Sequence, residues 1–281
     1  MGELSSVRLI CMDMDGTLLD GKGIPPLNLT ALRECDRRGI RLALVSGRNF
    51  RFLTDSASQI GPNVSIVSAN GARIDVMPEK ECIYEGTFDE AYARFVCDAL
   101  FETGVYFELY TESMNYVFNT ERISKIHKRS LENYLKNKQI LGLEFPEDPG
   151  KAIFRGIYKY VAFSDDPEMI ARVKARLDEA GIAHSSSWWD NVEVMAPGVG
   201  KGQAVGRLGR YFGISRSDVM AFGDQTNDLS LLGAAGWPVA MQNGVEEVKR
   251  VARIVAPPNT ESGVGQVIFR YVLETDVPEN L

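Results

Sequence analysis

Apolar and polar residues alternate in a regular way along the first seventy residues of the chain. Runs of consecutive apolar residues, typical of buried strands, are separated by stretches in which apolar residues recur every three to four positions, as on one face of a helix. This pattern predicts strands at 8–13, 40–46 and 64–69, with helices at 27–38 and 50–60. Strands that alternate with helices form a parallel sheet with crossover helices.

The same alternation returns near the C-terminal end, from about residue 192. It predicts strands at 191–196, 218–223 and 237–241, and helices at 203–212, 227–234, 245–251 and about 263–274. Because both ends of the chain have this pattern, we expect one domain that is interrupted by an insertion. The predicted fold class is α/β, with a Rossmann-like parallel sheet core covered by helices on both faces and formed by residues 1–83 and 192–281.

Residues 84–191 have a different pattern. Two predicted strands, at 105–110 and 115–119, are joined by a short turn-like segment, which is typical of an antiparallel hairpin. A further strand and three helices are predicted at 157–164 and at 88–103, 122–137 and 167–180. We therefore predict an inserted α+β domain with an antiparallel sheet. We interpret Trp188 and Trp189, near its end, as packing residues, with a stacking platform for a sugar as the alternative.

Composition and charge narrow the possible functions. The 281 residues are 44% hydrophobic and carry a formal net charge of −7. An acidic chain without clustered Lys and Arg is a poor match for nucleic acid or an anionic membrane. No apolar run reaches the ~20 residues of a membrane-spanning helix, and the N-terminus lacks the features of a signal peptide. We therefore expect a cytoplasmic protein whose partner is a small molecule.

Polar side chains follow the predicted strands of the core. They are Asp13 and Asp15 after the first strand, Ser46, Gly47 and Arg48 after the second, Asn70 after the third, and the segment GDQTND at 223–228 after a later strand, together with Lys201 at a helix start. In open α/β sheets, ligands bind outside the carboxyl ends of the strands. These side chains are therefore expected to meet at one site.

The clustered carboxylates at this site need an opposite charge. Mg²⁺ binds through one or two carboxylates together with substrate phosphate, and it would offset Asp13, Asp15 and Asp224. Lys201 and Ser46 would then face the phosphate oxygens. An aspartate can attack phosphorus to form an aspartyl-phosphate, and Asp15 can protonate the leaving alcohol and later deprotonate water.

Several motifs resemble those of the haloacid dehalogenase superfamily of phosphohydrolases, and of its Cof-type branch in particular. They are DMDGTLLD at 13–20, VSGR at 45–48, ANGA at 69–72, GVGKGQAV at 198–205, GDQTNDLSLL at 223–232 and AMQNGVEEVK at 240–249. They occur in the order typical of the family. The family's cap domain, which selects the substrate, would match residues 84–191. The residue after Asp224 is Gln225, where the resemblance leads us to expect a smaller residue or Asn.

The resemblance implies a role for each matching position. Asp13 matches the nucleophile and Asp15 the general acid and base, while Lys201 neutralises the phosphoryl group. The phosphate would be contacted by Ser46, Gly47, Asn227 and Lys201, and the metal by Asp13, the backbone carbonyl of Asp15, Asp224 and, through water, Asp228. Three residues have a structural and a functional interpretation each. Arg48 either caps or salt-bridges the next helix, or it contacts the substrate or its phosphate. Asn70 is a turn residue or a phosphate contact, and Asn243 is a loop residue near the site or a contact in it.

The predicted function is that of a Mg²⁺-dependent phosphatase that hydrolyses a small phosphorylated metabolite. The leading candidate for this substrate is a sugar phosphate. Two alternatives stay open. A phosphosugar mutase shares such a core but returns the phosphoryl group to its substrate. A regulatory module would bind Mg²⁺ and phosphate without turnover.

Overall fold

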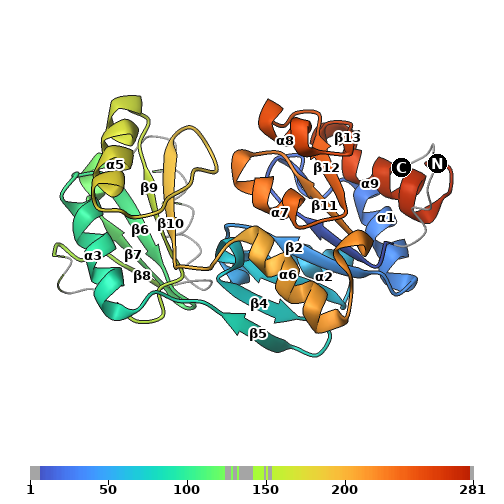
Figure 1. Cartoon of the computed structure of the whole chain (residues 1–281), viewed down its shortest axis with the longest axis horizontal. Coiled ribbons are helices and arrows are strands. Elements are labelled where there is room, and N and C mark those ends of the chain that lie inside the picture. Colours follow the sequence, from blue (N-terminus) through green and yellow to red (C-terminus); the bar gives the residue numbers. More distant parts are fainter. Residues whose placement is uncertain are drawn as a thin grey trace. The chain divides into compact units, whose positions relative to one another are not determined.

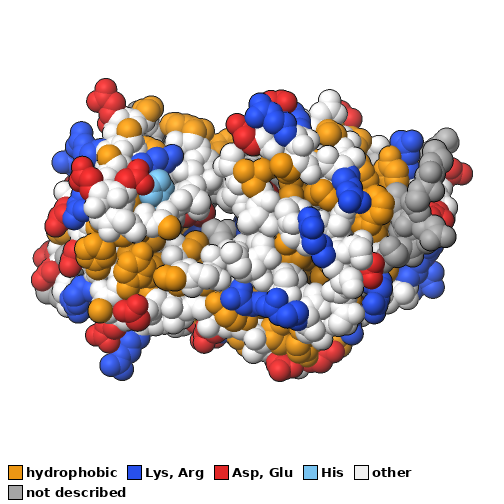
Figure 2. Space-filling view, in the orientation of Figure 1, with side chains coloured by type: hydrophobic (Ala, Val, Ile, Leu, Met, Phe, Trp, Pro, Cys, Tyr) orange, Lys and Arg blue, Asp and Glu red, His pale blue; other side chains and the backbone are white. Residues whose placement is uncertain are grey.

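The computed structural model describes residues 7–123, 128, 132, 142–148, 150 and 154–278. The chain forms two compact units, which divide between Glu85 and Gly86 and again between Gly198 and Val199. Among the described residues, no helix combines the length and the apolar character needed to cross a membrane. On the face shown in Figure 2, acidic and basic side chains are interspersed over both units.

The first unit is built on an eight-stranded sheet of order β13-β12-β11-β1-β2-β3-β4-β5 (Figure 1). Its parallel strands are β1 (Leu9–Met12), β2 (Arg41–Val45), β3 (Val64–Ser68), β11 (Val219–Gly223), β12 (Trp237–Met241) and β13 (Ile254–Ala256). Two strands, β4 (Arg73–Val76) and β5 (Glu81–Glu85), extend the sheet antiparallel at one edge. β1 lies at the centre because β11 and β2 pair with it on either side.

Helices cover both faces of this sheet. They are α1 (Pro26–Arg37), α2 (Thr54–Ile60), α6 (Lys201–Phe212), α7 (Leu229–Gly233), α8 (Glu246–Val251) and α9 (Gly263–Ile268). The four residues of β1 are all buried, and they divide between two hydrophobic clusters: Ile10 and Met12 join residues of α1, α2 and α9, whereas Leu9 and Cys11 join residues of α6, α7 and α8. A strand buried on both faces is continuously apolar, as this one is. The predicted fold class is confirmed.

The second unit has a five-stranded sheet of order β10-β9-β6-β7-β8. Its strands are β6 (Tyr106–Tyr110), β7 (Met114–Phe118), β8 (Gly142–Glu144), β9 (Lys159–Phe163) and β10 (Asn191–Met195), and its helices include α3 (Glu90–Phe101) and α5 (Pro167–Glu179). Both helices begin at an aspartate cap, because the side chains of Asp89 and Asp166 accept hydrogen bonds from the backbone amides of Tyr92 and Glu168.

Several predicted elements need correction. The strand expected in the core at 191–196 is β10, which pairs antiparallel with β9 in the smaller sheet. The helix expected at 50–60 is a 3₁₀ turn, Phe50–Phe52, followed by α2. The helix expected at 122–137 falls largely outside the described residues. β8 pairs in parallel with β7, although the sequence predicted an antiparallel sheet.

The packing interpretation of the tryptophan pair is wrong. The exposed fractions of Trp188 and Trp189 are 53% and 56%. Their loop is held by Asn191, whose side-chain oxygen accepts hydrogen bonds from the backbone amides of Ser187 and Trp188.

Candidate active site

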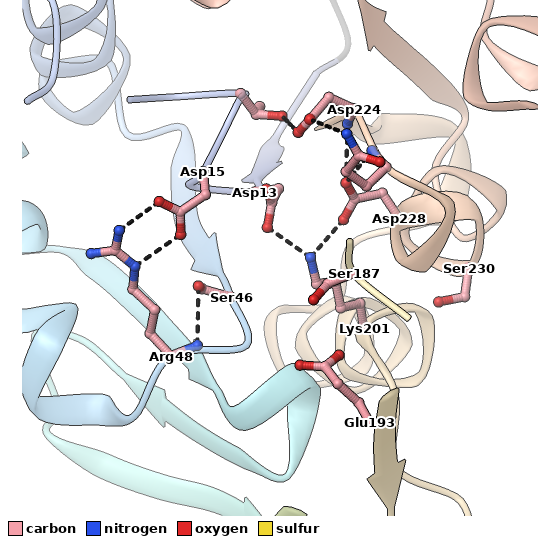
Figure 3. A network of polar contacts seen from close by, with 12 residues as sticks. Asp13, Asp15, Ser46, Arg48, Ser187, Glu193, Lys201, Asp224, Asp228 and Ser230 are labelled. Carbon is pink, nitrogen blue, oxygen red and sulfur yellow. Dashed lines mark hydrogen bonds and ion pairs between the residues drawn. The ribbon is translucent and has the colours of Figure 1, made fainter. Parts of the chain in front are cut away.

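The candidate active site forms where the central strands of the first unit end. Asp13 and Asp15 follow β1, Ser46 follows β2 and Asp224 follows β11, and these three strands are neighbours in the sheet. Lys201 is the first residue of α6. The sheet order therefore brings together residues more than 180 positions apart in the sequence, as Figure 3 shows for Asp13 and Lys201.

Lys201 lies between two carboxylates. Its Nζ donates to Oδ1 of Asp13 at 2.7 Å and to Oδ1 of Asp228 at 2.6 Å, and all three residues are buried. Burial raises the pKa of Asp13 well above its ordinary value and the nearby Asp228 adds to this, while Lys201 acts against it. Burial disfavours the ammonium of Lys201, but the two carboxylates outweigh that effect and hold its pKa above the ordinary value. Lys201 is therefore a fixed positive charge beside Asp13.

Asp224 is held by three neighbours. Thr17 donates its hydroxyl to Oδ1 of Asp224 at 2.7 Å, and Nε2 of Gln225 donates to Oδ2 at 3.2 Å. The backbone carbonyl of Asp224 accepts a hydrogen bond from the amide of Val245 at 2.9 Å. Burial raises the pKa of Asp224 to about 6, while the hydrogen bond from Thr17 acts in the opposite direction.

Asp228 fixes the turn after β11. Its Oδ2 accepts hydrogen bonds from the backbone amides of Asp224 at 3.0 Å and Gln225 at 3.1 Å. Gln225 stabilises the same turn, because its side chain accepts a hydrogen bond from the backbone of Asp228 and so completes a reciprocal capping box. Asn227 is half-buried in the same turn.

The buried carboxylates form a donor set for a hard cation. Asp13, Asp224 and Asp228 each offer an oxygen, and these oxygens lie within 4.8 Å of one another. When all three are ionised, Lys201 offsets only one of their charges. Buried charges without compensation are costly, and carboxylate oxygens at this spacing fit Mg²⁺. The carboxylate of Asp15 is not part of this group; the resemblance assigns its backbone carbonyl to the metal.

Gly16 allows the loop after β1 to approach Asp224. Its φ is +81°, and a Cβ atom built there would lie 2.4 Å from Oδ2 of Asp224. Asn243 fixes this loop, because its Nδ2 donates to the carbonyl of Gly16 at 2.8 Å. The side chain of Asn243 in turn accepts from the amide of Asn259 at 3.0 Å. Asn243 thus fixes the loop through the backbone of Gly16.

Asp15 is held by Arg48. Nε and Nη2 of Arg48 donate to the two oxygens of Asp15 at 2.9 and 2.5 Å (Figure 3). The side chain of Asp15 is 64% exposed, unlike the buried Asp13. Ser46 belongs to the same group, since its hydroxyl accepts a hydrogen bond from the backbone amide of Arg48 at 3.2 Å. The salt-bridge interpretation of Arg48 is therefore right in kind, but its partner is Asp15 and not the next helix.

The remaining predicted residues lie in the turns around the site. Gly47 is half-buried between Ser46 and Arg48. Asn70 is buried with a φ of 55°, so its turn role is supported, and its backbone amide donates to the carbonyl of Ser46 at 2.9 Å. Thr17 and Asn259 were not predicted. Thr17 could have been identified from its hydroxyl and its position directly after Gly16, whereas no local pattern marks Asn259.

Comparisons with known proteins agree with this geometry. The family model of the haloacid dehalogenase-like hydrolases matches residues 10–268. The 5-amino-6-(5-phospho-D-ribitylamino)uracil phosphatase YwtE of Bacillus subtilis is 29% identical over 93% of this chain and 97% of its own length. The pyridoxal phosphate phosphatase YbhA of Escherichia coli is 26% identical over 95% of this chain and 100% of its own.

A solved structure gives the same result. A haloacid dehalogenase-like hydrolase from B. subtilis superposes with a TM-score of 0.81 and 28% identity, covering 93% of this chain and 99% of that one. Because the family model spans nearly the whole chain and the relatives are named phosphatases, this protein belongs to the haloacid dehalogenase-like hydrolases and is a phosphatase of that family.

Proposed function

We propose that this protein hydrolyses a small phosphomonoester with Mg²⁺ as its cofactor and through an aspartyl-phosphate intermediate on Asp13. The observation that carries the proposal is the position of Asp13. Its buried carboxylate lies at the end of the central strand, with Lys201 on one oxygen and Asp224 and Asp228 beside it.

Asp13 is the proposed nucleophile. Lys201 binds Oδ1, which leaves the second oxygen of Asp13 to attack phosphorus. The bond from phosphorus to the ester oxygen breaks as the bond to Asp13 forms. Lys201 keeps its positive charge beside the transferring group and stabilises the negative charge that the phosphoryl oxygens carry in the transition state.

Asp15 is the proposed general acid and base. It lies two residues after the nucleophile and is exposed, so it can reach the ester oxygen and water. It would give a proton to the leaving alcohol. It would then take a proton from the water that attacks phosphorus and releases phosphate from Asp13. Arg48 binds its two oxygens through separate nitrogens, so one of these bonds must open for the acid step while the other keeps the carboxylate oriented.

The donor set described above would hold Mg²⁺ at Asp13, Asp224 and Asp228, with the backbone carbonyl of Asp15 as a further ligand. When bound, the ion would shield the charge of the phosphate from the carboxylates and orient the ester for in-line attack. Thr17 and Gln225 support this set, since they orient Asp224 through its two oxygens.

Covalent labelling tests the proposed intermediate. An acid quench during turnover of a ³²P-labelled phosphomonoester should trap label on the wild-type protein, and mass spectrometry should place it on Asp13. Asp13→Asn should take up none. Asp20→Asn is a matched control, because Asp20 serves a turn, where its Oδ1 accepts from the amides of Lys22 and Gly23. Label that persists in Asp13→Asn would overturn the proposal.

The product distinguishes a hydrolase from the mutase alternative. Net release of inorganic phosphate at the rate of ester loss supports the hydrolase. An isomeric phosphoester formed without net phosphate release would instead support a mutase.

A further inference from the structure

A pocket of about 690 Å³ lies in the first unit, at the end of the large sheet opposite the candidate active site. Its wall is formed by residues 7–8 and 38–41, which lead into β1 and β2, by the end of α6 with the residues that follow it, and by residues 272–274. Small-molecule sites have volumes of about 300–1,000 Å³, so the pocket is large enough for a ligand. A strand rises about 3.3 Å per residue, which places Arg8 roughly 16 Å from Asp13 along β1.

Arginine side chains dominate the charge of this pocket, which we call the arginine pocket. The charged residues in the described part of its wall are Arg8, Arg38, Arg41 and Glu274. The whole chain carries a net charge of −7, so three cations beside one carboxylate oppose its overall charge. Arg38 is partly neutralised, because its Nε binds Oε1 of Glu34 at 2.8 Å. The local field still favours an anion.

The other two arginines have no ion pair within the part of the chain that the structure describes. Nη1 of Arg8 donates to the backbone carbonyl of Gly213 at 3.5 Å. The guanidinium of Arg41 lies 4.6 Å from the centre of the Phe212 ring. A guanidinium has several N–H donors, and these contacts use at most one of them. Arg8 and Arg41 therefore keep both their charge and most of their donors for a bound molecule.

The side chains of Arg8 and Arg41 start from adjacent backbone positions. The amide of Arg41 donates to the carbonyl of Arg8 at 2.9 Å, and neighbouring strands lie about 5 Å apart. Arg8 is exposed and Arg41 is half-buried, so a ligand can reach both. A guanidinium binds phosphate oxygens through paired hydrogen bonds, and two guanidinium groups at this spacing suit a diphosphate.

Apolar side chains line the wall beside the arginines. Ile214 and Leu273 are buried, and Phe212 is half-buried. Leu273 ends a π-helical turn, Phe269–Leu273, and turns of this rare kind occur frequently at functional sites. Nη1 of Arg38 donates to the carbonyl of Leu273 at 3.3 Å and so fixes this turn against α1. An uncharged organic group can pack on this wall next to the cations.

We infer that the arginine pocket binds an organic diphosphate, of which a nucleoside diphosphate is the type. The diphosphate would bind Arg8 and Arg41, and the organic group would lie against the apolar wall. This inference goes beyond the proposed function and does not depend on it. The pocket lies at the amino ends of the strands, and the ligand would be bound there without being hydrolysed.

Isothermal titration calorimetry in EDTA tests the inference. The probe is adenosine 5′-(α,β-methylene)diphosphate, whose carbon bridge resists hydrolysis. We expect one molecule to bind per chain, and Kd to rise at least about tenfold in Arg8→Gln and in Arg41→Gln. Adenosine, which lacks the phosphates, should bind at least about tenfold more weakly than the probe. No binding of the probe to the wild type, or an unchanged Kd in both variants, would overturn the inference.

Arg172→Gln is the matched control for charge. Arg172 is exposed on α5 in the second unit, and its replacement lowers the net charge as much as the changes in the pocket do. Its Kd should stay within about twofold of the wild-type value. An equal loss in Arg172→Gln would mean that the probe responds to net charge alone, and the inference would fail. Unchanged melting temperatures of the pocket variants confirm that they are folded.

Ser46→Ala distinguishes the arginine pocket from the active site. Ser46 is a predicted phosphate contact at the other end of the sheet, so its loss should leave Kd for the probe unchanged. Weaker binding in Ser46→Ala, with normal binding in Arg8→Gln, would place the probe in the active site and overturn the inference. Binding of the probe to Asp13→Asn would support the pocket even if no ester is hydrolysed. Hydrolysis of esters by a wild type that does not bind the probe would leave the phosphatase standing and overturn the pocket.

Discussion

The guanidinium of Arg48 binds both carboxylate oxygens of Asp15, at 2.9 and 2.5 Å, across 33 residues of sequence. The pair is partly exposed, so it contributes little to stability. Its importance is one of position. Arg48 keeps the proposed general acid and base in one orientation beside Asp13, at the end of the central strand.

Arg48→Gln should therefore reduce turnover according to the leaving group. We expect kcat to fall about tenfold for an alkyl phosphate, whose leaving oxygen needs a proton, and less for p-nitrophenyl phosphate, whose leaving group departs readily as an anion. Steady-state kinetics on the two esters measures the difference. Arg51→Gln, a change at an exposed arginine three residues further on, is the control and should alter neither. Equal losses on both esters would mean that Arg48 does not act through Asp15.

Gly16→Ala should damage the site more than Gly21→Ala does. Both glycines have a positive φ, +81° and +89°, so both alanines meet a backbone cost of about 1 kcal/mol. Only at Gly16 would the new Cβ meet another group, Oδ2 of Asp224, at 2.4 Å. Besides this backbone cost, Gly16→Ala should therefore lower both the affinity for Mg²⁺ and the turnover, each by at least about tenfold. Thermal unfolding with and without Mg²⁺, together with phosphate release, measures both effects. Identical behaviour of the two variants would show that this close approach is unimportant.

Metal-free protein should lose stability as the pH rises through the titration of Asp224. Its pKa is about 6 in the folded protein, above the ordinary value of 3.8, so the folded state binds this proton more tightly than the unfolded state does. The contribution of Asp224 to the free energy of unfolding is then largest below pH 4, and it declines by about 2 kcal/mol between about pH 4 and 6. Urea unfolding in EDTA at stepped pH follows it.

Asp224→Asn isolates this effect, because it removes the titrating group. In EDTA at pH 7 the variant should be more stable than the wild type, and below pH 4 the two should converge. Excess Mg²⁺ should reverse the order at pH 7, since only the wild type has the full donor set. A wild type that is the more stable of the two in EDTA at pH 7 would contradict the prediction.

The sequence predicts the core of the fold well because its strands are buried on both faces. A strand such as Leu9–Met12 is continuously apolar, and the polar residues that follow it mark the carboxyl end of the sheet. Asp13, Asp224 and Lys201 could be assigned to one site on this basis and by resemblance to a family. The contact between Lys201 and Asp228 could not be predicted from the sequence, because it depends on how the turn after β11 folds back.

Strand partners were harder to predict. Asn191–Met195 alternates polar and apolar residues, and this pattern fits an edge of either sheet, so the sequence placed it with the wrong one. The antiparallel strands β4 and β5 were missed because they follow the third core strand closely and have a mixed composition. The hydrogen bond from Nδ2 of Asn259 to the carbonyl of Leu19 joins positions 240 residues apart, with no local signal at either end.

The proposed nucleophile and metal dependence are tested together by measuring phosphate release by the wild type and by Asp13→Asn. The assay uses a panel of sugar phosphates, ribitol 5-phosphate and phenyl phosphate, with Mg²⁺ and with EDTA. We predict release by the wild type in Mg²⁺ only, and a loss of at least about a thousandfold in Asp13→Asn, whose fold is retained by circular dichroism. Comparable release by Asp13→Asn, or release by the wild type that is unaffected by EDTA, would contradict the account.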